Sequence, residues 1–264
     1  MFRQLSNKIV LITGASSGIG ESCAKIFHQN GNHVILCGRR VEKLNLIKEQ
    51  LVSSNSSGKV FVSQVDVSSL ESIEKMINGL PEDMKNIDIL VNNAGLSLGM
   101  DPVSSLDVGK DLDAVMDTNV KGVFRVTRMV LPGMIQRNSG YIFNVSSIAG
   151  SMWYANGSAY CASKAAVTAF SDVLRKEVVQ TKIRVTNVCP GLVETEFSLV
   201  RFSGDSDKAK KPYNGIIPLT ADDIADNIFY CASRPEHVQI TTIEAMANNQ
   251  ASTSVIYREP VENK

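Results

Sequence analysis

The sequence alternates between short apolar runs and longer segments with helical periodicity, and this alternation constrains the fold more than any other feature. The runs that predict strands are KIVLI from Lys8, HVILC from His33, VFVSQVDV from Val60, IDILVNNAG from Ile87, GYIFNVSS from Gly140, IRVTNVCPG from Ile183 and VQITTIE from Val238. The first run is almost continuously apolar, as expected of a strand that is covered on both faces. The pattern predicts an α/β protein with a doubly wound parallel sheet of about seven strands and helices on both faces.

The segments between the runs predict helices. Their expected ranges are about Ile19 to Asn30, Val41 to Val52, Leu70 to Leu80, Asp107 to Arg137, Ala159 to Gln180 and Ala221 to Ser233. We expect the fourth helix to bend or break around Pro132 and Gly133, and Thr220 to cap the last helix. The polar stretch from Thr195 to about Pro218 predicts an irregular segment. Because no linker or change in composition is visible, we expect one domain over residues 1–264 with right-handed crossovers.

Composition and charge exclude several classes of protein. The chain has 264 residues, of which 44% are hydrophobic, enough for a buried core. The 27 basic and 27 acidic residues balance, so no electrostatic attraction to nucleic acid is expected. The first residues lack a signal-sequence pattern, and no apolar run approaches the roughly 18 residues that span a membrane. We therefore expect a cytoplasmic protein with neither nucleic acid nor membrane as a partner.

Cysteine and histidine show no metal-binding pattern. The five cysteines are scattered without CxxC spacing, which favours reduced thiols used as small core residues. His28, His33 and His237 form no HxxxH pair, and we expect them at the surface or at strand edges. The sequence therefore predicts no metal site.

A glycine-rich loop, TGASSGIG, runs from Thr13 to Gly20 between the first predicted strand and the first predicted helix. Its glycines allow a tight turn, a close approach of a pyrophosphate to the backbone, and close packing of helix on strand. The helix N-terminus offers N–H groups and a partial positive charge to phosphates. We expect this loop to bind a dinucleotide rather than to be only a structural turn. The residues that we expect to bind it are Gly14, Ser16, Ser17, Ile19 and Gly20.

The end of the second predicted strand bears on the choice between NAD and NADP. An NAD site normally has an acidic residue there to bind the ribose 2′-hydroxyl, but no acid occurs between His33 and Val41. Arg39 and Arg40 stand in its place, and a guanidinium pairs well with a 2′-phosphate. The alternative is a solvated basic pair in a loop. The arginines favour NADP.

Further cofactor contacts are expected where later strands end, because ligands bind beyond the carboxyl ends of parallel strands. Asp66 and Val67 follow the third strand and are placed to contact the adenine. Asn93, Ala94 and Gly95 follow the fourth, where the middle of the nucleotide is expected. The alternative for this second set is an ordinary turn at the end of a strand.

Tyr160 and Lys164 lie one helical turn apart, so their side chains leave the same face. At about 4 Å and an effective dielectric of about 20, the ammonium would stabilise a phenolate by roughly 4 kcal/mol, or up to about three pKa units. This predicts a shift of the Tyr160 pKa toward about 7 to 8, suited to a general base. The small residues around the pair leave space for a cofactor and a substrate. The alternative is a surface lysine.

Two more polar residues fit the same site. Ser147 follows the fifth predicted strand, where its hydroxyl can hold the substrate oxygen while Tyr160 moves the proton. Asn119 lies within the fourth predicted helix, although asparagine is a poor helix former. It is either an ordinary polar residue on a helix face, or it marks a kink or water site that relays protons through Lys164.

With these residues in hand, the chain resembles the short-chain dehydrogenase/reductase family from Lys8 to about Glu244. The matching motifs, in order, are TGASSGIG, NNAG, TNVKG, NVSSIAG, YCASK and PGLVET. The resemblance implies a Rossmann-type fold and a catalytic tetrad of Asn119, Ser147, Tyr160 and Lys164. It also implies that Lys164 binds the nicotinamide ribose. The motif PGLVET is expected to line the nicotinamide side through Pro190, Val193 and Thr195.

The C-terminal third is similar to the NADP-dependent 3-hydroxy acid dehydrogenases, also described as serine or L-allo-threonine dehydrogenases. That similarity implies a small 3-hydroxy acid substrate, held by Ser147 and Tyr160, and a homotetramer. Arg201 is a candidate for holding the substrate carboxylate, against a solvated loop arginine. Other possibilities are an NADPH-dependent reductase of a 3-oxoacyl thioester, diketone, steroid or sugar, a nucleotide sensor without catalysis, and a scaffold.

Overall fold

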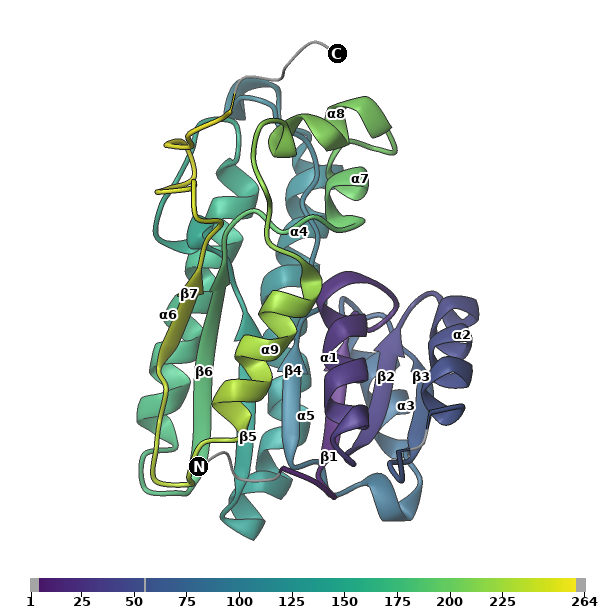
Figure 1. Ribbon diagram of the computed structural model, residues 1–264. Helices are drawn as coiled ribbons and strands as arrows, with labels where there is room; N and C mark the ends of the chain where they lie inside the picture. Colours follow the sequence, from purple (N-terminus) through teal and green to yellow (C-terminus); the bar gives the residue numbers. More distant parts are fainter. Residues whose placement is uncertain (1–4, 55, 260–264) are drawn as a thin grey trace.

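The computed structural model describes residues 5–54 and 56–259, and its strands form one parallel sheet in the order β3-β2-β1-β4-β5-β6-β7 (Figure 1). The strands are β1 Ile9–Thr13, β2 His33–Gly38, β3 Val60–Gln64, β4 Ile89–Asn92, β5 Gly140–Val145, β6 Ile183–Pro190 and β7 Thr242–Ala245. The strand order changes direction between β1 and β4, as in a doubly wound Rossmann sheet. The predicted fold class is confirmed.

Helices cover both faces of this sheet (Figure 1). They are α1 Gly18–Gln29, α2 Val41–Val52, α3 Leu70–Asn78, α4 Asp113–Met116, α5 Gly122–Arg137, α6 Ser158–Glu177, α7 Phe197–Arg201, α8 Ser206–Lys210 and α9 Ala221–Ala232. Buried side chains of α1, α2 and α9 belong to one apolar cluster, and those of α3, α5 and α6 to another. The two clusters lie on opposite faces of the sheet.

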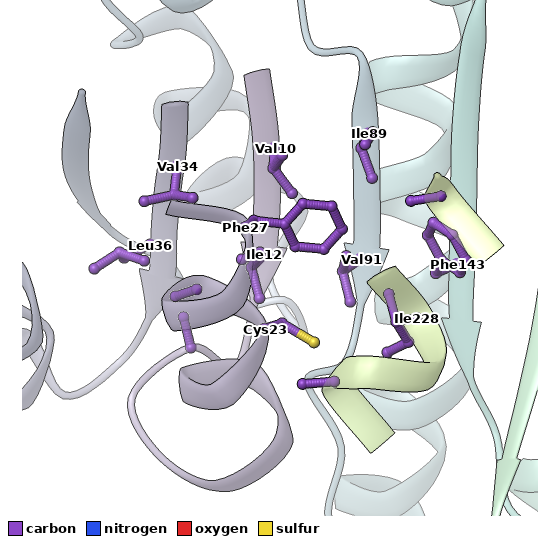
Figure 2. Close-up of a cluster of buried hydrophobic side chains, with 14 of the residues drawn as sticks. Val10, Ile12, Cys23, Phe27, Val34, Leu36, Ile89, Val91, Phe143 and Ile228 are labelled. Carbon is purple, nitrogen blue, oxygen red and sulfur yellow. The ribbon is translucent and has the colours of Figure 1, made fainter. Parts of the chain in front are cut away.

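Strand β1 shows why the first apolar run is nearly continuous. Val10 and Ile12 pack into the cluster that contains Phe27 of α1 and Ile228 of α9 (Figure 2). Leu11 points into the cluster on the other face. Because successive side chains of a strand alternate between faces, a strand buried on both sides needs apolar residues at every position.

The long helix expected from Asp107 to Arg137 is irregular in a different place from the one predicted. Helix α5 runs through Pro132 without a break. Pro132 has no N–H to donate to the Arg128 carbonyl, and both residues are exposed. The irregularity lies upstream, in two π-helical turns, η3 (Val108–Leu112) and η4 (Asp117–Lys121).

The segment after Thr195 is also more ordered than its composition suggested. It forms α7, α8 and a 3-10 turn, Lys211–Tyr213, where an irregular segment was expected. Asp205 caps α8 by accepting a hydrogen bond from Lys208 N at 3.0 Å. The predicted cap of α9 is confirmed, because Thr220 and Asp223 form a capping box.

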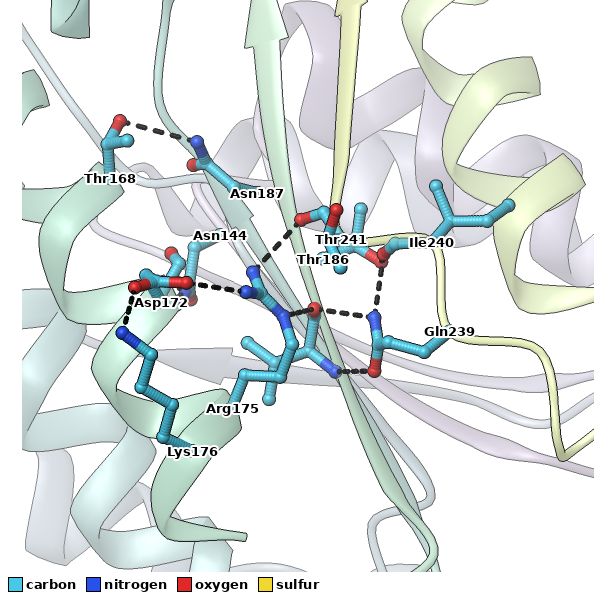
Figure 3. A network of polar contacts seen from close by, with 12 residues as sticks. Asn144, Thr168, Asp172, Arg175, Lys176, Thr186, Asn187, Gln239, Ile240 and Thr241 are labelled. Carbon is cyan, nitrogen blue, oxygen red and sulfur yellow. Dashed lines mark hydrogen bonds and ion pairs between the residues drawn. The ribbon is translucent and has the colours of Figure 1, made fainter. Parts of the chain in front are cut away.

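The last strand is shorter than predicted, since β7 begins at Thr242 and not at Val238. Upstream of it, the Gln239 side chain takes the place of backbone pairing (Figure 3). Its Oε1 accepts from Val185 N at 3.0 Å, and its Nε2 donates to Val185 O at 2.8 Å. A side-chain amide can copy a backbone peptide group, which a strand pattern in the sequence does not reveal.

His28 corrects the expectation that the histidines lie at the surface or at strand edges. Its side chain is buried, and its Nε2 lies 2.8 Å from Gly58 O. His33 begins β2 and accepts from Lys59 N at 2.9 Å, while His237 is exposed. All five cysteines are free and buried, as expected. Across residues 5–54 and 56–259, no cluster of acidic, cysteine or histidine side chains has a metal-binding arrangement, and no helix has the length and apolarity of a membrane span.

Candidate active site

A cavity of about 550 Å³ lies at the carboxyl ends of the parallel strands. It gathers nearly all residues that the sequence singled out, although they lie far apart in the chain. The predicted residues that line it are Gly14, Ser16, Ser17, Ile19, Arg39, Arg40, Asp66, Val67, Asn93, Ala94, Gly95, Ser147, Tyr160, Lys164, Pro190, Val193, Thr195 and Arg201. Gly20 and Asn119 are not among the lining residues and lie behind the wall.

The glycine-rich loop has the backbone conformation that its glycines allow. Gly14 and Gly18 have φ values of +66° and +56°, in the left-handed region. A Cβ at Gly18 would lie 3.1 Å from Thr195 Cγ2, so the glycine-rich loop packs closely on the segment after β6. Gly20 leaves room for the carbonyl of Gly14 and lets α1 approach the loop.

The first turn of α1 is open toward the cavity. Ser17 occupies the N-cap position, but its hydroxyl accepts a hydrogen bond from Arg40 Nη2 at 2.7 Å instead of capping the helix. Ser17, Gly18 and Ile19 line the cavity, so the positive end of the helix dipole lies at its wall. This arrangement suits a phosphate group.

Arg40 connects the loop to a later part of the chain. Its Nε and Nη2 donate to Ser16 Oγ at 3.1 and 2.9 Å, and its Nη1 pairs with Glu196 Oε2 at 2.7 Å. The sequence did not single out Glu196, whose only signal was an acidic residue directly after PGLVET. Arg40 therefore has several polar partners, and the alternative of a fully solvated basic pair does not describe it.

Arg39 lies near Asp66 at the ends of two neighbouring strands. Asp66 Oδ1 accepts from the N and Oγ of Ser68 at 2.9 and 2.7 Å. Burial acts to raise the pKa of Asp66, but the hydrogen bonds from Ser68 and the charge of Arg39 together lower it. Asp66 is therefore an ionised acceptor at neutral pH, next to a cation.

The catalytic residues predicted on α6 meet Ser147 at the end of β5. Lys164 is buried, and its Nζ donates to Val145 O at 2.8 Å. Ser147 Oγ accepts from Ala149 N at 3.1 Å and donates to Pro190 O at 3.4 Å. The hydroxyl, the phenol and the ammonium thus line the same part of the cavity.

The pKa of Tyr160 differs from the prediction. Burial raises it above the ordinary value, and the charge of Arg201 and the Ser147 hydroxyl act in the opposite direction. Lys164 Nζ lies 5.7 Å from the centre of the Tyr160 ring, farther than Arg201 Cζ at 5.0 Å. Burial lowers the pKa of Lys164 itself to about 8. The predicted shift of Tyr160 toward 7 to 8 through Lys164 is therefore wrong for this arrangement.

Asn119 lies in the π-helical turn η4 and joins three parts of the site. Its Oδ1 accepts from Leu96 N at 2.8 Å, and its Nδ2 donates to Leu96 O at 2.8 Å and to Ser163 Oγ at 3.0 Å. A Cβ at Gly95 would lie 3.3 Å from Asn119 Oδ1 and 3.5 Å from Lys164 Nζ. Asn119 is buried, so the alternative of a polar residue on an exposed helix face is wrong.

Arg201 comes from α7 and reaches the catalytic tyrosine. Its Cζ lies 5.0 Å from the ring centre of Tyr160 and 5.2 Å from that of Phe197. Its Nε is buried without a hydrogen-bond partner, and no carboxylate in residues 5–54 and 56–259 forms an ion pair with it. Burial raises the pKa of the neighbouring Tyr154 to about 12, with the charge of Arg201 acting against it. No pattern in the sequence indicated Tyr154.

Comparisons with known proteins agree with this geometry. The family model for short chain dehydrogenases matches residues 8–204, more than half of the chain, and the protein therefore belongs to the short-chain dehydrogenase family.

Among its relatives is the NADP-dependent 3-hydroxy acid dehydrogenase YdfG of Escherichia coli K12, which is 46% identical over 92% of this chain and 96% of the relative. The serine 3-dehydrogenase of Rhizobium radiobacter is 41% identical over 95% and 98%. A solved structure of the closed form of serine dehydrogenase complexed with NADP+ has a TM-score of 0.88 and 44% identity, covering 95% of this chain and 99% of that chain.

Proposed function

We propose that the protein is an NADP-dependent dehydrogenase that oxidises the 3-hydroxyl group of small 3-hydroxy acids such as serine, L-allo-threonine and 3-hydroxybutyrate. The observation that carries this proposal is Arg201, a cation beside Tyr160 that has no carboxylate partner in the described part of the chain. A 3-hydroxy acid brings both a hydroxyl for Tyr160 and a carboxylate for Arg201. The names of the relatives support the same substrate class.

The residues of the cavity fit NADP. The open first turn of α1 suits the pyrophosphate. Arg39 and Arg40 suit the 2′-phosphate, and Asp66 with Val67 suits the adenine side.

The other end of the cavity fits the nicotinamide half. We assign Asn93, Ala94 and Gly95 to the middle of the cofactor and Lys164 to the nicotinamide ribose. Pro190, Val193 and Thr195 of the PGLVET motif line the cavity, and we assign them to the nicotinamide side. When bound there, NADP supplies the ring carbon that accepts the hydride.

The protein's own residues orient the substrate and move its proton. Ser147 Oγ holds the substrate oxygen, and Tyr160 Oη accepts the proton from the substrate hydroxyl as the carbon gives up its hydride. In the reverse direction Tyr160 donates that proton to the carbonyl oxygen. Because burial raises the pKa of Tyr160, the phenol is protonated at neutral pH and has a proton to supply, whereas oxidation needs the phenolate and is favoured at higher pH. Asn119 is a positioning residue that holds the Leu96 backbone, and the preceding residue, Gly95, lies close to Lys164 Nζ.

Arg201 and Tyr160 together define which alcohols suit the site. In a 3-hydroxy acid a single carbon separates the carboxyl carbon from the carbon that bears the hydroxyl. A substrate of this size reaches both the guanidinium and the phenol, which lie side by side. A charge-assisted contact in a partly desolvated cavity is stronger than a neutral one, so the carboxylate contributes both binding energy and orientation.

The test is a panel of alcohols and both coenzymes, followed by NADPH absorbance. We expect turnover of 3-hydroxybutyrate and of serine with NADP, and much lower kcat/KM for neutral alcohols and with NAD. Reduction of 3-oxoacyl thioesters, diketones, steroids or sugars at rates above those of the 3-hydroxy acids would contradict the substrate assignment. A preference for NAD would contradict the cofactor assignment.

The proposal also includes a single domain and a homotetramer in the cytoplasm. One sheet takes strands from Ile9 to Ala245, which supports the single domain. Phe124 of α5 and Val173 of α6 are exposed apolar side chains, and the Phe124 ring packs at a tilt against Phe170 with ring centres 4.0 Å apart. This exposed apolar surface supports self-association. Sedimentation equilibrium of the purified chain measures the oligomeric state, and a monomer would contradict it.

A further inference from the structure

The carboxylate of Glu196 forms an ion pair with Arg40, whose guanidinium we assign to the 2′-phosphate of NADP. Arg40 uses Nε and Nη2 on the serines of the glycine-rich loop, and its Nη1 pairs with Glu196 Oε2 at 2.7 Å. The other carboxylate oxygen of Glu196 pairs with Lys43 Nζ at 2.6 Å. Arg40 is thus shared between the loop that suits the pyrophosphate and a carboxylate of this chain.

The charge on Glu196 is present throughout the working pH range. Hydrogen bonds from Lys43 and Arg40 lower its pKa to about 2. A ribose 2′-phosphate carries about two negative charges at neutral pH and three acceptor oxygens, whereas the carboxylate carries one charge and two oxygens. Both anions suit the same guanidinium, and like charges repel each other at short range.

Glu196 also connects the arginine to the substrate side of the cavity. It is the N-cap residue of α7, the helix that carries Phe197 and Arg201. Both of these side chains lie against Tyr160, with the Phe197 ring centre at 5.6 Å and Arg201 Cζ at 5.0 Å from the tyrosine ring centre. A change in the partner of Glu196 therefore acts directly on the helix that positions Arg201.

We propose that Glu196 is an intramolecular competitor for the 2′-phosphate at Arg40, and that its displacement by the phosphate frees the start of α7 from the cofactor loop. This inference deepens the proposed function and rests on its assignment of NADP to Arg39 and Arg40. Glu196 is then a specificity residue that weakens binding of the phosphorylated cofactor and makes the position of Arg201 depend on it. Lys43 keeps hold of the displaced carboxylate, so the segment is released only from Arg40.

The test uses binding of two cofactor fragments and needs no turnover. Adenosine 2′,5′-bisphosphate carries the 2′-phosphate, and adenosine 5′-monophosphate lacks it. In calorimetric titrations of the full chain, Glu196→Gln should bind the bisphosphate about two- to fivefold more tightly, because exposed ion pairs are weak, and the monophosphate unchanged. Glu194→Gln is the matched control, since Glu194 lies exposed in the same loop and forms no ion pair within residues 5–54 and 56–259. It should change neither affinity.

A second measurement follows the helix itself. At saturation, amides of residues 197–201 should exchange hydrogen faster with the bisphosphate than with the monophosphate in the wild type, and equally fast in Glu196→Gln. Unchanged bisphosphate affinity in Glu196→Gln, an equal gain for both fragments, or the same gain in Glu194→Gln would overturn the inference.

Arg40→Ala separates this inference from the function on which it rests. Loss of the preference for the bisphosphate in Arg40→Ala, without an effect of Glu196→Gln, overturns only the competitor role. An intact preference in Arg40→Ala overturns the assignment of the 2′-phosphate to Arg40 and the competitor role together, and the same preference in Arg39→Ala combined with Arg40→Ala overturns the cofactor assignment as well.

Discussion

Two regions of the cavity are held in place in different ways. The catalytic wall, which carries Ser147, Tyr160 and Lys164, is fixed by buried polar contacts between α6 and the sheet. Asn144 Nδ2 donates to Ser171 Oγ at 2.9 Å. Asn187 Nδ2 donates to Thr168 Oγ1 at 3.3 Å (Figure 3). Buried hydrogen bonds between side chains favour one arrangement of the elements, although Asn187 Oδ1 itself has no partner within residues 5–54 and 56–259.

The cover segment, residues 196–213, is held by contacts that are partly buried or exposed. Tyr213 Oη lies 2.6 Å from Ser198 Oγ and donates to Val193 O at 2.9 Å. The link from Glu196 to Arg40 joins two side chains that are 40% and 44% exposed. The comparison shows that the residues proposed for the proton chemistry lie in a wall with buried polar contacts, whereas Arg201, proposed to bind the substrate carboxylate, lies in a segment held in part by exposed ion pairs.

The largest effect should come from the catalytic wall. Tyr160→Phe removes the proton acceptor, and we expect kcat to fall about 10²- to 10⁴-fold while the affinity for NADP stays within about threefold of the wild type, since no phosphate contact is lost. Single-turnover kinetics and fluorescence titration measure the two quantities. Tyr230→Phe, an exposed tyrosine on α9, is the control. Ordinary turnover in Tyr160→Phe would remove the chemical role of the wall.

A smaller effect is expected at the cofactor loop. Arg39→Ala combined with Arg40→Ala should weaken NADP binding about 10- to 100-fold, because two charge-assisted contacts are lost. Binding of NAD should change little. Dissociation constants for both coenzymes, with the exposed Arg128→Ala as a control, check this. An equal loss for NAD and NADP would show that the arginines do not read the 2′-phosphate.

The smallest effect is expected for stability. The catalytic wall contains the buried charge of Lys164, and the cover segment has its ion pairs at the surface. Burial lowers the pKa of Lys164 from 10.5 to about 8. A shift of this size means that the buried ammonium lowers the free energy of unfolding by roughly 3 kcal/mol below pH 8. The hydrogen bond from Lys164 to Val145 O contributes about 1 kcal/mol in the opposite direction. At pH 7 the free energy of unfolding of Lys164→Met should therefore be about 2 kcal/mol higher than that of the wild type.

The pH dependence of that difference follows from proton binding. Between about pH 8 and 10.5 the unfolded chain holds the Lys164 proton and the folded chain does not, so wild-type stability rises with pH in this window. The advantage of Lys164→Met should shrink by pH 10. Urea unfolding at pH 7 and pH 10 measures both values, and the same difference at both pH values would contradict a buried, destabilised ammonium.

The same two regions differ in how far the sequence predicted them. The wall follows from local rules, since a spacing of four residues puts Tyr160 and Lys164 on one helix face and parallel strands bring Ser147 to the same edge. The glycine-rich loop and the arginines after β2 were predictable for the same reason. Each of these residues stands in a motif that can be recognised in the sequence, and the parallel sheet brings the residues together at one edge.

The features of the site that could not be predicted depend on contacts between segments that lie far apart in the sequence. The pKa of Tyr160 depends on burial and on the charge of Arg201, which lies 41 residues further along the chain. Helix α7 is only Phe197–Arg201, too short for a periodic signal. The ion pair of Glu196 with Arg40 joins segments separated by 156 positions. Charge composition alone does not pair such residues.

We propose that the cover segment selects the substrate through Arg201 while the catalytic wall performs the chemistry. The most direct test is kcat/KM of Arg201→Met for 3-hydroxybutyrate and for butan-2-ol, with Arg201→Lys as the variant that keeps the charge. We predict a fall of about 100-fold for the acid, as expected for a lost charged contact of about 3 kcal/mol. For the neutral alcohol we predict a fall of at most about tenfold, because Tyr160 stays in place and loses only the contribution of the Arg201 charge to its pKa. An equal fall for both substrates, or no fall for the acid, would contradict the account.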